Sequence, residues 1–442
     1  MGDALDRYLE ELAWPVPEVD SWPAPQPDLD AVAVIPALKE RHTLPRTLRR
    51  LQQATGAPER LEIIVVVNNG PEASDSTIDE NRATVRWLDD LDAPASVQVL
   101  DRIGPQHTIE QGAPGVGAAR RLGLDAALRR LTRSSANTPF DARLLLSLDA
   151  DAPPDPGYLD AIRRSWHRSE GASTAAALTR YAHRWADDRH ARPIALYEAW
   201  LRLYDLGFEW AGSPFIFQAL GSTQVIPATT YARADGMPPM KAREDFAMIE
   251  KIIKNEGPGS VHRLQDPVVR PAGRTSERTP LGTGQSVSDL VEDSAAKAPT
   301  LPPLAAFRDL RRLNRSLEAI YDSNSPGDVL LDSTDSRLAD YLAEIDGPEH
   351  ATKLATHAPD AAGFVAQWHR WFDGRRTVTY TMRRAGAEAT ALLDFSHDLL
   401  QETAPELVGR LPGKVDSTAE SIEFMELLRT IDRNRHELLD IH

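Results

Sequence analysis

Short runs of branched apolar residues alternate with stretches of helical spacing over the first 150 residues, and this alternation constrains the fold most. The runs have the length of strands and the composition of strands that are buried on both faces. They lie at residues 31–36, 61–67, 97–100 and 143–148. Strands alternating with helices form a mostly parallel sheet with helices on both faces. The sequence therefore predicts an α/β fold, with any ligand at the carboxyl ends of the strands.

Changes in proline content and in amino-acid composition divide the chain into three predicted parts. Residues 1–28 are rich in Pro and Trp, which disfavours regular helix or central strand, so we expect an arm lying over the body. Residues 29–287 contain the strand and helix alternation. Residues 288–442 are rich in Leu, Ala, Arg and Glu at helical spacing and predict an all-helical region. That spacing suits a homo-oligomer formed through these helices and equally a cover over an acceptor site.

Charge and cysteine content exclude several classes of function. The 442 residues carry 50 Lys and Arg against 66 Asp and Glu, a formal charge of −16, which disfavours nucleic acid as a partner. There is no Cys, which excludes disulfides, thiolate catalysis and Cys-based metal sites. The first residues lack the basic stretch and following apolar run of a secretory signal peptide. No apolar run approaches the ~20 residues of a transmembrane helix. We therefore expect a cytoplasmic protein without a membrane span.

Two carboxylates follow the fourth predicted strand in Asp149-Ala150-Asp151. At this spacing both carboxylates can bind one hard cation. Mg²⁺ and Mn²⁺ prefer oxygen ligands and usually take some of them from substrate phosphates. The same short motif is often no more than a polar turn at a strand end, and on its own it favours that interpretation.

A second acidic pair, Glu244-Asp245, opens a predicted helix. Acidic residues in a first helical turn are stabilised by the helix dipole, which alone explains the pair. The functional hypothesis is that Asp245 takes a proton from an attacking hydroxyl while Glu244 orients the site.

Glycines and arginines mark two segments suited to phosphate. Gly115 and Gly117 begin a helix that carries Arg120, but the position of the third glycine of a dinucleotide fingerprint is this Arg120, which disfavours a Rossmann oxidoreductase. Arg274 and Arg278 lie in a Gly-containing segment that could close over a diphosphate or an anionic acceptor, with an ordinary solvated linker as the equal alternative.

In this order the motifs resemble glycosyltransferase family 2, whose members have the GT-A fold. The matching segments are Val34-Ile35-Pro36-Ala37-Leu38-Lys39-Glu40, Val65-Val66-Val67-Asn68-Asn69-Gly70, Gly115-Val116-Gly117-Ala118-Ala119-Arg120, Asp149-Ala150-Asp151 and Glu244-Asp245. The resemblance covers about residues 30–284 and does not reach the helical end. This chain departs from the family pattern at Lys39 and Arg121, where Asn is usual, and at Asn68-Asn69, where an acidic residue is common.

The resemblance implies a role for each matching residue. It places Pro36, Ala37 and Glu40 in the nucleotide pocket and Asn68 or Asn69 near the base. It places Gly115, Gly117 and Arg120 near the base and ribose. It implies that Asp149 and Asp151, as a D-x-D motif, hold the diphosphate through Mn²⁺ or Mg²⁺, with Asp151 the more direct ligand, and that Asp245 is the base of an inverting transfer.

The predicted function is therefore metal-dependent transfer of a sugar from a UDP- or GDP-sugar to an acceptor hydroxyl, with inversion, by an enzyme of the hexosyltransferase type. Two alternatives stay open: a retaining transferase that resembles the glucosyl-3-phosphoglycerate and mannosylglycerate synthases, and a non-catalytic binding scaffold with the same fold. A nucleotidyltransferase is disfavoured, because the basic glycine loop that such enzymes carry after the first strand is missing.

Overall fold

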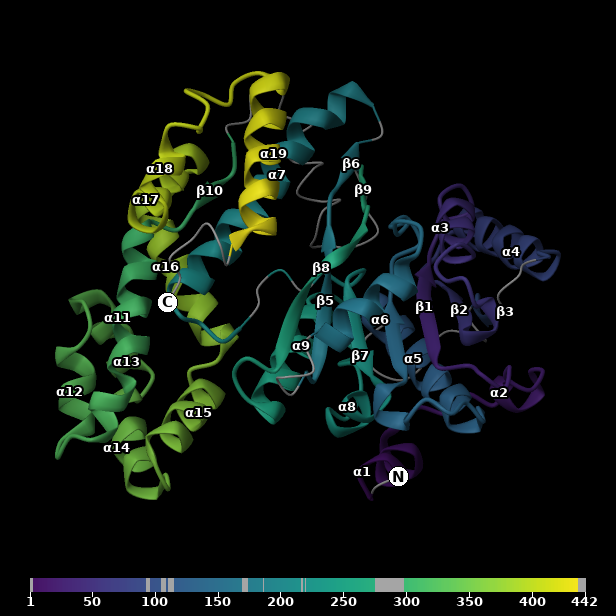
Figure 1. Cartoon of the computed structure of the whole chain (residues 1–442), viewed down its shortest axis with the longest axis horizontal. Helices are drawn as coiled ribbons and strands as arrows, with labels where there is room; N and C mark the ends of the chain where they lie inside the picture. Colours follow the sequence, from purple (N-terminus) through teal and green to yellow (C-terminus); the bar gives the residue numbers. More distant parts are fainter. Residues whose placement is uncertain are drawn as a thin grey trace. The chain divides into compact units, whose positions relative to one another are not determined.

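A computed structural model describes residues 3–92, 96–104, 109, 115–168, 174–185, 187–215, 218, 220–274 and 298–435. The chain forms two compact units (Figure 1). The first comprises Met1–Ala186, Ala219–Glu256 and Ser260–Ser288, and the second comprises Asp187–Gln218, Gly257–Gly259 and Asp289–His442. The predicted boundary between residues 287 and 288 lies outside the described residues.

A seven-stranded sheet is the centre of the first unit. Its spatial order is β3-β2-β1-β4-β7-β5-β8, and every neighbouring pair is parallel except those that β7 makes with β4 and β5. The strands are β1 (Ala31–Ala37), β2 (Leu61–Asn68), β3 (Ser96–Arg102), β4 (Leu144–Ser147), β5 (Ala176–Tyr181), β7 (Gln224–Pro227) and β8 (Val261–Val269). A separate short pair joins β6 (Arg184–Trp185) to β9 (Ala272–Gly273) in parallel.

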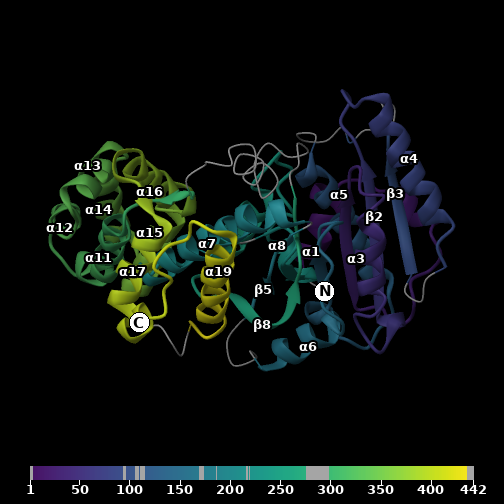
Figure 2. The same cartoon turned by 90° about the horizontal axis from the view of Figure 1, so that it is seen from above.

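Helices cover both faces of this sheet because successive side chains of a strand point to opposite faces. Ile35 of β1 packs in one cluster with Leu48 of α3 and Ile162 of α6, whereas Val34 faces α5. Helix α4 lies alongside β2 and β3 at one edge of the sheet (Figure 2). The α-helices that follow β1 in this unit are α3 (Leu44–Leu51), α4 (Asp75–Asp89), α5 (Val116–Arg133), α6 (Tyr158–Arg168), α8 (Ala228–Arg233) and α9 (Glu244–Glu256). With the helices of the second unit, the predicted fold class is confirmed.

Helix α5 approaches the sheet closely at Gly123. A Cβ at this position would lie 2.9 Å from the Cγ2 of Val66 and closer still to the side chain of Val34. Because the helix backbone lies directly on these valine side chains, there is no room for a larger residue at this position. The amino-terminal end of α5 is thereby fixed relative to β1 and β2.

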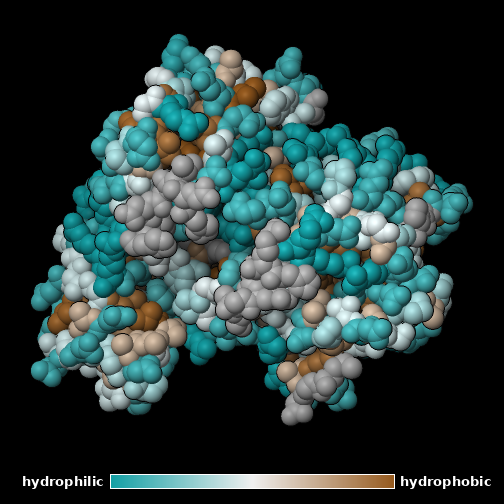
Figure 3. All heavy atoms as spheres, viewed as in Figure 1, coloured by the Kyte–Doolittle hydropathy of each residue, from teal (hydrophilic) through white to brown (hydrophobic). Residues whose placement is uncertain are grey.

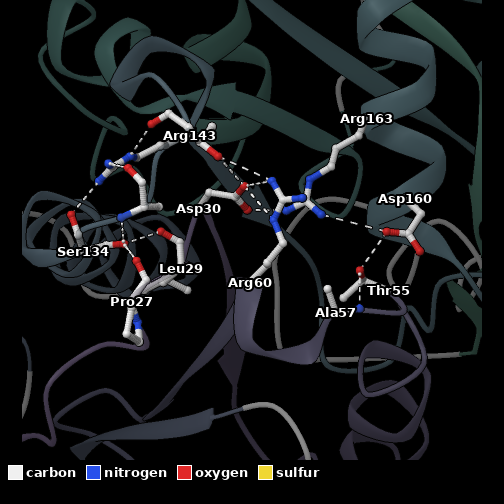
Figure 4. Close-up of polar contacts among 12 residues, drawn as sticks. Pro27, Leu29, Asp30, Thr55, Ala57, Arg60, Ser134, Arg143, Asp160 and Arg163 are labelled. Carbon is white, nitrogen blue, oxygen red and sulfur yellow. Dashed lines mark hydrogen bonds and ion pairs between the residues drawn. The ribbon is translucent and has the colours of Figure 1, made fainter.

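The amino end of the sheet is closed by a buried ion network (Figure 4). Asp30, which is 2% exposed, accepts hydrogen bonds from Arg60 Nε at 3.0 Å and Thr138 Oγ1 at 2.8 Å, and it is also paired with Arg163. Beside it, the guanidinium of Arg143 donates to the carbonyls of Leu131, Ser134 and Ala136 at the end of α5. The polar groups at this end satisfy one another, as buried charges must.

The first residues of the chain pack on α5. Tyr8 is buried and donates to Asp125 Oδ1 at 2.6 Å, and Arg130 donates to the carbonyl of Pro23 at 2.7 Å. The expectation that this segment has no regular helix was wrong in part. Short helices form before the first proline and between prolines: α1 (Asp3–Arg7), η1 (Tyr8–Leu12) and α2 (Glu18–Ser21). Proline is tolerated just outside a helix, and Pro17 directly precedes α2.

The second unit is mainly helical. Its core contains Phe208, Phe307, Phe364, Trp368 and Phe395. It includes α7, which precedes the other helices in sequence by about 100 residues. Its elements are α7 (Asp188–Trp210), β10 (Thr300–Leu301), α11 (Leu304–Tyr321), α12 (Pro326–Asp332), α13 (Ser336–Glu344), α14 (Gly347–His357), α15 (Ala361–Trp371), α16 (Gly374–Glu388), β11 (Thr390–Ala391), α17 (Leu392–Thr403), α18 (Pro405–Val408) and α19 (Thr418–Arg433).

Ion pairs join α7 to α19 within the second unit. Glu198 is fully buried and accepts from Arg202 Nη2 at 2.8 Å and from Arg429 Nε at 2.7 Å.

Among the described helices of the chain, none has the length and apolar character needed to cross a bilayer. Hydrophilic residues cover most of the face in Figure 3.

Candidate active site

The carboxyl ends of the parallel strands bring predicted site residues to one edge of the sheet. Glu40 follows β1, and Asp149 and Asp151 follow β4, which is the strand next to β1. Helix α3 holds the turn between the two aspartates, because Thr47 Oγ1 donates to the carbonyl of Ala150 at 2.8 Å. The sequence pattern did not predict this contact of Thr47 with the turn.

Arg274 links Glu40 to Asp151. Its Nη2 lies 2.7 Å from Glu40 Oε1 and 2.8 Å from Asp151 Oδ2, and its Nε lies 3.0 Å from the same oxygen of Asp151. Burial alone would lower the pKa of the guanidinium, but the charges of Asp151 and Glu40 raise it. The three predicted residues therefore form one charged group, which we call the Arg274 group.

Arg120 links Asp149 to Glu244. One terminal nitrogen of this buried guanidinium pairs with Glu244 and the other with Asp149. Burial opposes the charge, yet Asp149 and Glu244 outweigh it and raise the pKa of Arg120. The side chain packs against Gly221, where any Cβ would overlap the guanidinium. Arg120 with these two carboxylates forms a second charged group, the Arg120 group.

Asp245 lies next to Glu244 of the Arg120 group, and the pKa of its carboxyl group is raised. Loss of hydration and the charge of Glu244 raise its pKa from 3.8 to about 7, against the opposing charge of Arg120. Its backbone is fixed by Gln224, whose Nε2 donates to the Asp245 carbonyl at 2.9 Å, and its Oδ1 accepts from the amide of Phe246 at 2.8 Å. A carboxylate with a pKa near neutrality has the acidity of a general base.

The residues immediately before Glu40 and Glu244 both have left-handed backbone. Lys39 has φ 56° and Arg243 has φ 64°, a region that costs a residue with a side chain about 1–2 kcal/mol. Such strained positions cluster at functional sites, where the surrounding structure holds them. Here each one turns the chain so that the next residue meets an arginine.

Gly115 and Gly117 contact protein backbone. A Cβ at Gly117 would lie 2.9 Å from the nitrogen of Met240 and closer still to its carbonyl oxygen, and Gly115, at φ 154°, lies against Lys241. These glycines let α5 pack on the segment that leads to Glu244. Close packing is thus a sufficient reason for glycine here, and the predicted contact with a nucleotide stays a prediction.

The remaining predicted residues lie at the ends of the first two strands or outside the described chain. Pro36 and Ala37 end β1, and Asn68 ends β2. The carbonyl of Asn68 accepts from Asn81 at 3.1 Å, and Asn69 Oδ1 accepts from the amide of Gly104 at 3.3 Å, so these groups stabilise the end of β2. Arg278 lies outside the described residues.

The carboxylates fit a metal ion that arrives with phosphate. The described ranges contain no group of three or more His, Cys, Asp or Glu side chains placed to hold an ion. Asp149 and Asp151 nevertheless offer hard oxygen ligands and are 36% and 20% exposed. Mg²⁺ in proteins usually takes one or two carboxylates together with substrate phosphates. The donor set therefore suits an ion whose other ligands come from a diphosphate.

Comparisons with known proteins give distant structural likenesses. No protein-family model matches the sequence, and no curated protein does. The chain is similar in structure to the mannosyltransferase PcManGT from Pyrobaculum calidifontis in complex with GDP-Man and Mn²⁺, at 18% identity and a TM-score of 0.36 over 89% of this chain and 91% of that one. It is also similar to S. aureus TarS 1-349 in complex with UDP-GlcNAc, at 12% identity and a TM-score of 0.36 over 77% and 90%.

Proposed function

We propose that this protein is a glycosyltransferase of the family 2 type, which moves a sugar from a nucleotide-diphosphate donor to an acceptor hydroxyl with inversion. The observation that supports this most is the joint placement of Asp245, with its pKa of about 7, and of Asp149 around Arg120. Arg120 pairs with the carboxylate proposed for the leaving group and with Glu244, the residue next to the proposed base. Fold alone would not carry the proposal, because one fold serves many functions.

In this proposal each residue acts through an ordinary chemical property. The carboxylate of Asp245 accepts the proton of the acceptor hydroxyl, the hydroxyl oxygen bonds to the anomeric carbon, and the bond from that carbon to the diphosphate breaks. Glu244 and Arg120 hold the base in place. Asp149 and Asp151 would hold Mn²⁺ or Mg²⁺, which when bound neutralises negative charge on the departing diphosphate.

We also propose that the nucleotide part of the donor binds at the carboxyl ends of the first two strands. Pro36, Ala37 and Glu40 would line the nucleotide site, with Asn68 and Asn69 near the base. The contact of Arg274 with both carboxylate oxygens of Glu40, just after β1, supports this assignment.

Ligand-dependent unfolding tests the proposal first. UDP and GDP are each titrated with and without Mn²⁺ while the melting temperature is followed, since a ligand at ~100 times its dissociation constant stabilises by about 2.7 kcal/mol. A flat response to every nucleotide and metal would favour the non-catalytic scaffold. The nucleotide that binds identifies which nucleotide-sugars to assay for release of nucleoside diphosphate.

Product stereochemistry then separates inversion from retention. An α-linked donor gives a β-linked product if Asp245 acts as the base of a single displacement. Nuclear magnetic resonance of the product reads this linkage directly, and an α-linked product would exclude the inverting mechanism.

A further inference from the structure

Two arginines that the proposed mechanism does not use, Arg46 and Arg184, lie near the turn that contains Asp151. We propose that Arg46 and Arg184, together with Arg274, bind a phosphate-type anion; this rests on the proposed function for its place in the reaction. The ligand class is a phosphate or diphosphate group, carried either by the nucleotide donor or by an acidic acceptor. We call these three residues the arginine cluster.

The fold brings the cluster together from three separate elements. Arg46 lies in the first turn of α3, next to Thr47, which binds the backbone between the two aspartates. Arg184 lies on β6, opposite Ala272 of β9, and its Nε donates to the carbonyl of Arg270 at 3.2 Å. Arg274 directly follows β9 and reaches Asp151. Arg184 interacts electrostatically with Arg46, Arg274 and Asp151, so the three guanidiniums lie near one another beside the turn after β4.

The cluster carries positive charge that the described carboxylates do not neutralise. Arg274 is paired with Glu40 and Asp151, whereas neither Arg46 nor Arg184 makes an ion pair with a carboxylate in the described part of the chain. Burial lowers the pKa of Arg184, and the charges of Arg46 and Arg274 lower it further, with only Asp151 opposing them. An anion bound among these side chains would relieve that repulsion.

Guanidinium groups favour phosphate over other ligands of the same charge. Their planar fork donates two parallel hydrogen bonds to phosphate oxygens, and they remain charged at any working pH. Arg46 is exposed, and Arg184 is half-buried with its Nε already engaged by the backbone. Arg184 is thus held in place by the protein, while the solvent-facing Arg46 can adjust to a ligand.

The test measures anion binding by calorimetry in the full chain. Inorganic pyrophosphate, UDP and GDP are titrated into the wild type and into R46Q, R184Q and the control R49Q, which alters an exposed arginine on the same helix as Arg46. We expect R184Q and R46Q each to weaken pyrophosphate binding by roughly 10- to 100-fold, the effect of losing charged hydrogen bonds, and R49Q to leave it unchanged.

Two arms distinguish the source of the anion. If the cluster binds the donor diphosphate, R184Q and R46Q weaken UDP or GDP to the same extent as pyrophosphate. If it binds an acidic acceptor, their nucleotide affinity is unchanged, and inorganic phosphate binds wild type already saturated with nucleotide but not R184Q. Either result supports the cluster.

Two results would overturn the inference. One is wild type that binds none of these anions, and the other is R184Q and R46Q that bind all of them as the wild type does. Failure of the proposed function is a different outcome, in which the wild type binds pyrophosphate through the cluster but cleaves no nucleotide-sugar.

Discussion

Replacing Asp245 by Asn should abolish turnover and stabilise the protein. The rise of its pKa from 3.8 to about 7 means that ionising Asp245 costs the folded protein roughly 4 kcal/mol more than the unfolded chain. The folded state holds the proton more tightly, so this group lowers stability as the pH rises from about 4 to about 7. Asn cannot ionise and keeps an oxygen for the amide of Phe246. D245N should therefore be more stable than wild type by up to roughly 4 kcal/mol at pH 8, and by less than roughly 2 kcal/mol at pH 5.

Urea denaturation at pH 8 and pH 5 measures the stability, and release of nucleoside diphosphate measures turnover. Loss of a general base lowers turnover by about 10²–10⁴-fold. The control is D79N, an exposed aspartate on α4, which should change stability by no more than about 0.5 kcal/mol at either pH. A D245N protein whose stability tracks that of D79N would show that the Asp245 carboxyl is an ordinary one. Turnover near that of the wild type would remove Asp245 from the role of base.

Three further perturbations test the site and its supports. G117A should lower turnover more than tenfold and lower stability by about 1–3 kcal/mol, because the added Cβ meets the backbone of Met240. The control G56A should change neither quantity, because the space around Gly56 is open. Equal behaviour of the two variants would contradict the packing role of Gly117. K39N should raise stability by about 0.5–1 kcal/mol in thermal unfolding, since Asn adopts left-handed backbone more readily than Lys; a lower melting temperature would refute the strain at Lys39. Mn²⁺ followed by electron paramagnetic resonance should bind at least about tenfold more tightly with UDP or GDP present than alone, and D151A should lose that increase; equal affinity with and without nucleotide would mean that the protein supplies the whole site.

The first four strands could be predicted because each is rich in apolar residues, most of them branched. The runs at 31–36 and 61–67 correspond to β1 and β2 within one residue at their ends. Strands β5, β7 and β8 escaped prediction because they lack that signal. β7 has four residues, and β8 contains charged residues and Pro267 within its nine. Their places in the sheet are set by pairing with distant strands, which a local pattern does not contain.

The acidic residues of the candidate site could be predicted, but their partners could not. Asp149 and Asp151 are visible in the sequence because they follow a buried strand directly. Arg120 and Glu244 are 124 positions apart, and Arg274 and Glu40 are 234 apart. Whether an arginine faces solvent, a ligand or a carboxylate depends on such distant contacts. Arg46 and Arg184 carried no signal at all, since isolated arginines on a helix and a short strand are common.

The Arg120 group explains how a carboxyl group with a pKa near 7 can lie beside an arginine. A lone guanidinium would lower the pKa of Asp245, because an opposite charge nearby favours the ionised form. Glu244 and Asp149 occupy both terminal nitrogens of Arg120, so its charge is already balanced where Asp245 stands. Burial and the negative charge of Glu244 then dominate and hold the proton on Asp245. In the proposed mechanism Glu244 is accordingly a positioning residue whose negative charge raises the pKa of the base, Asp245. The left-handed backbone at Arg243 directs Glu244 toward Arg120.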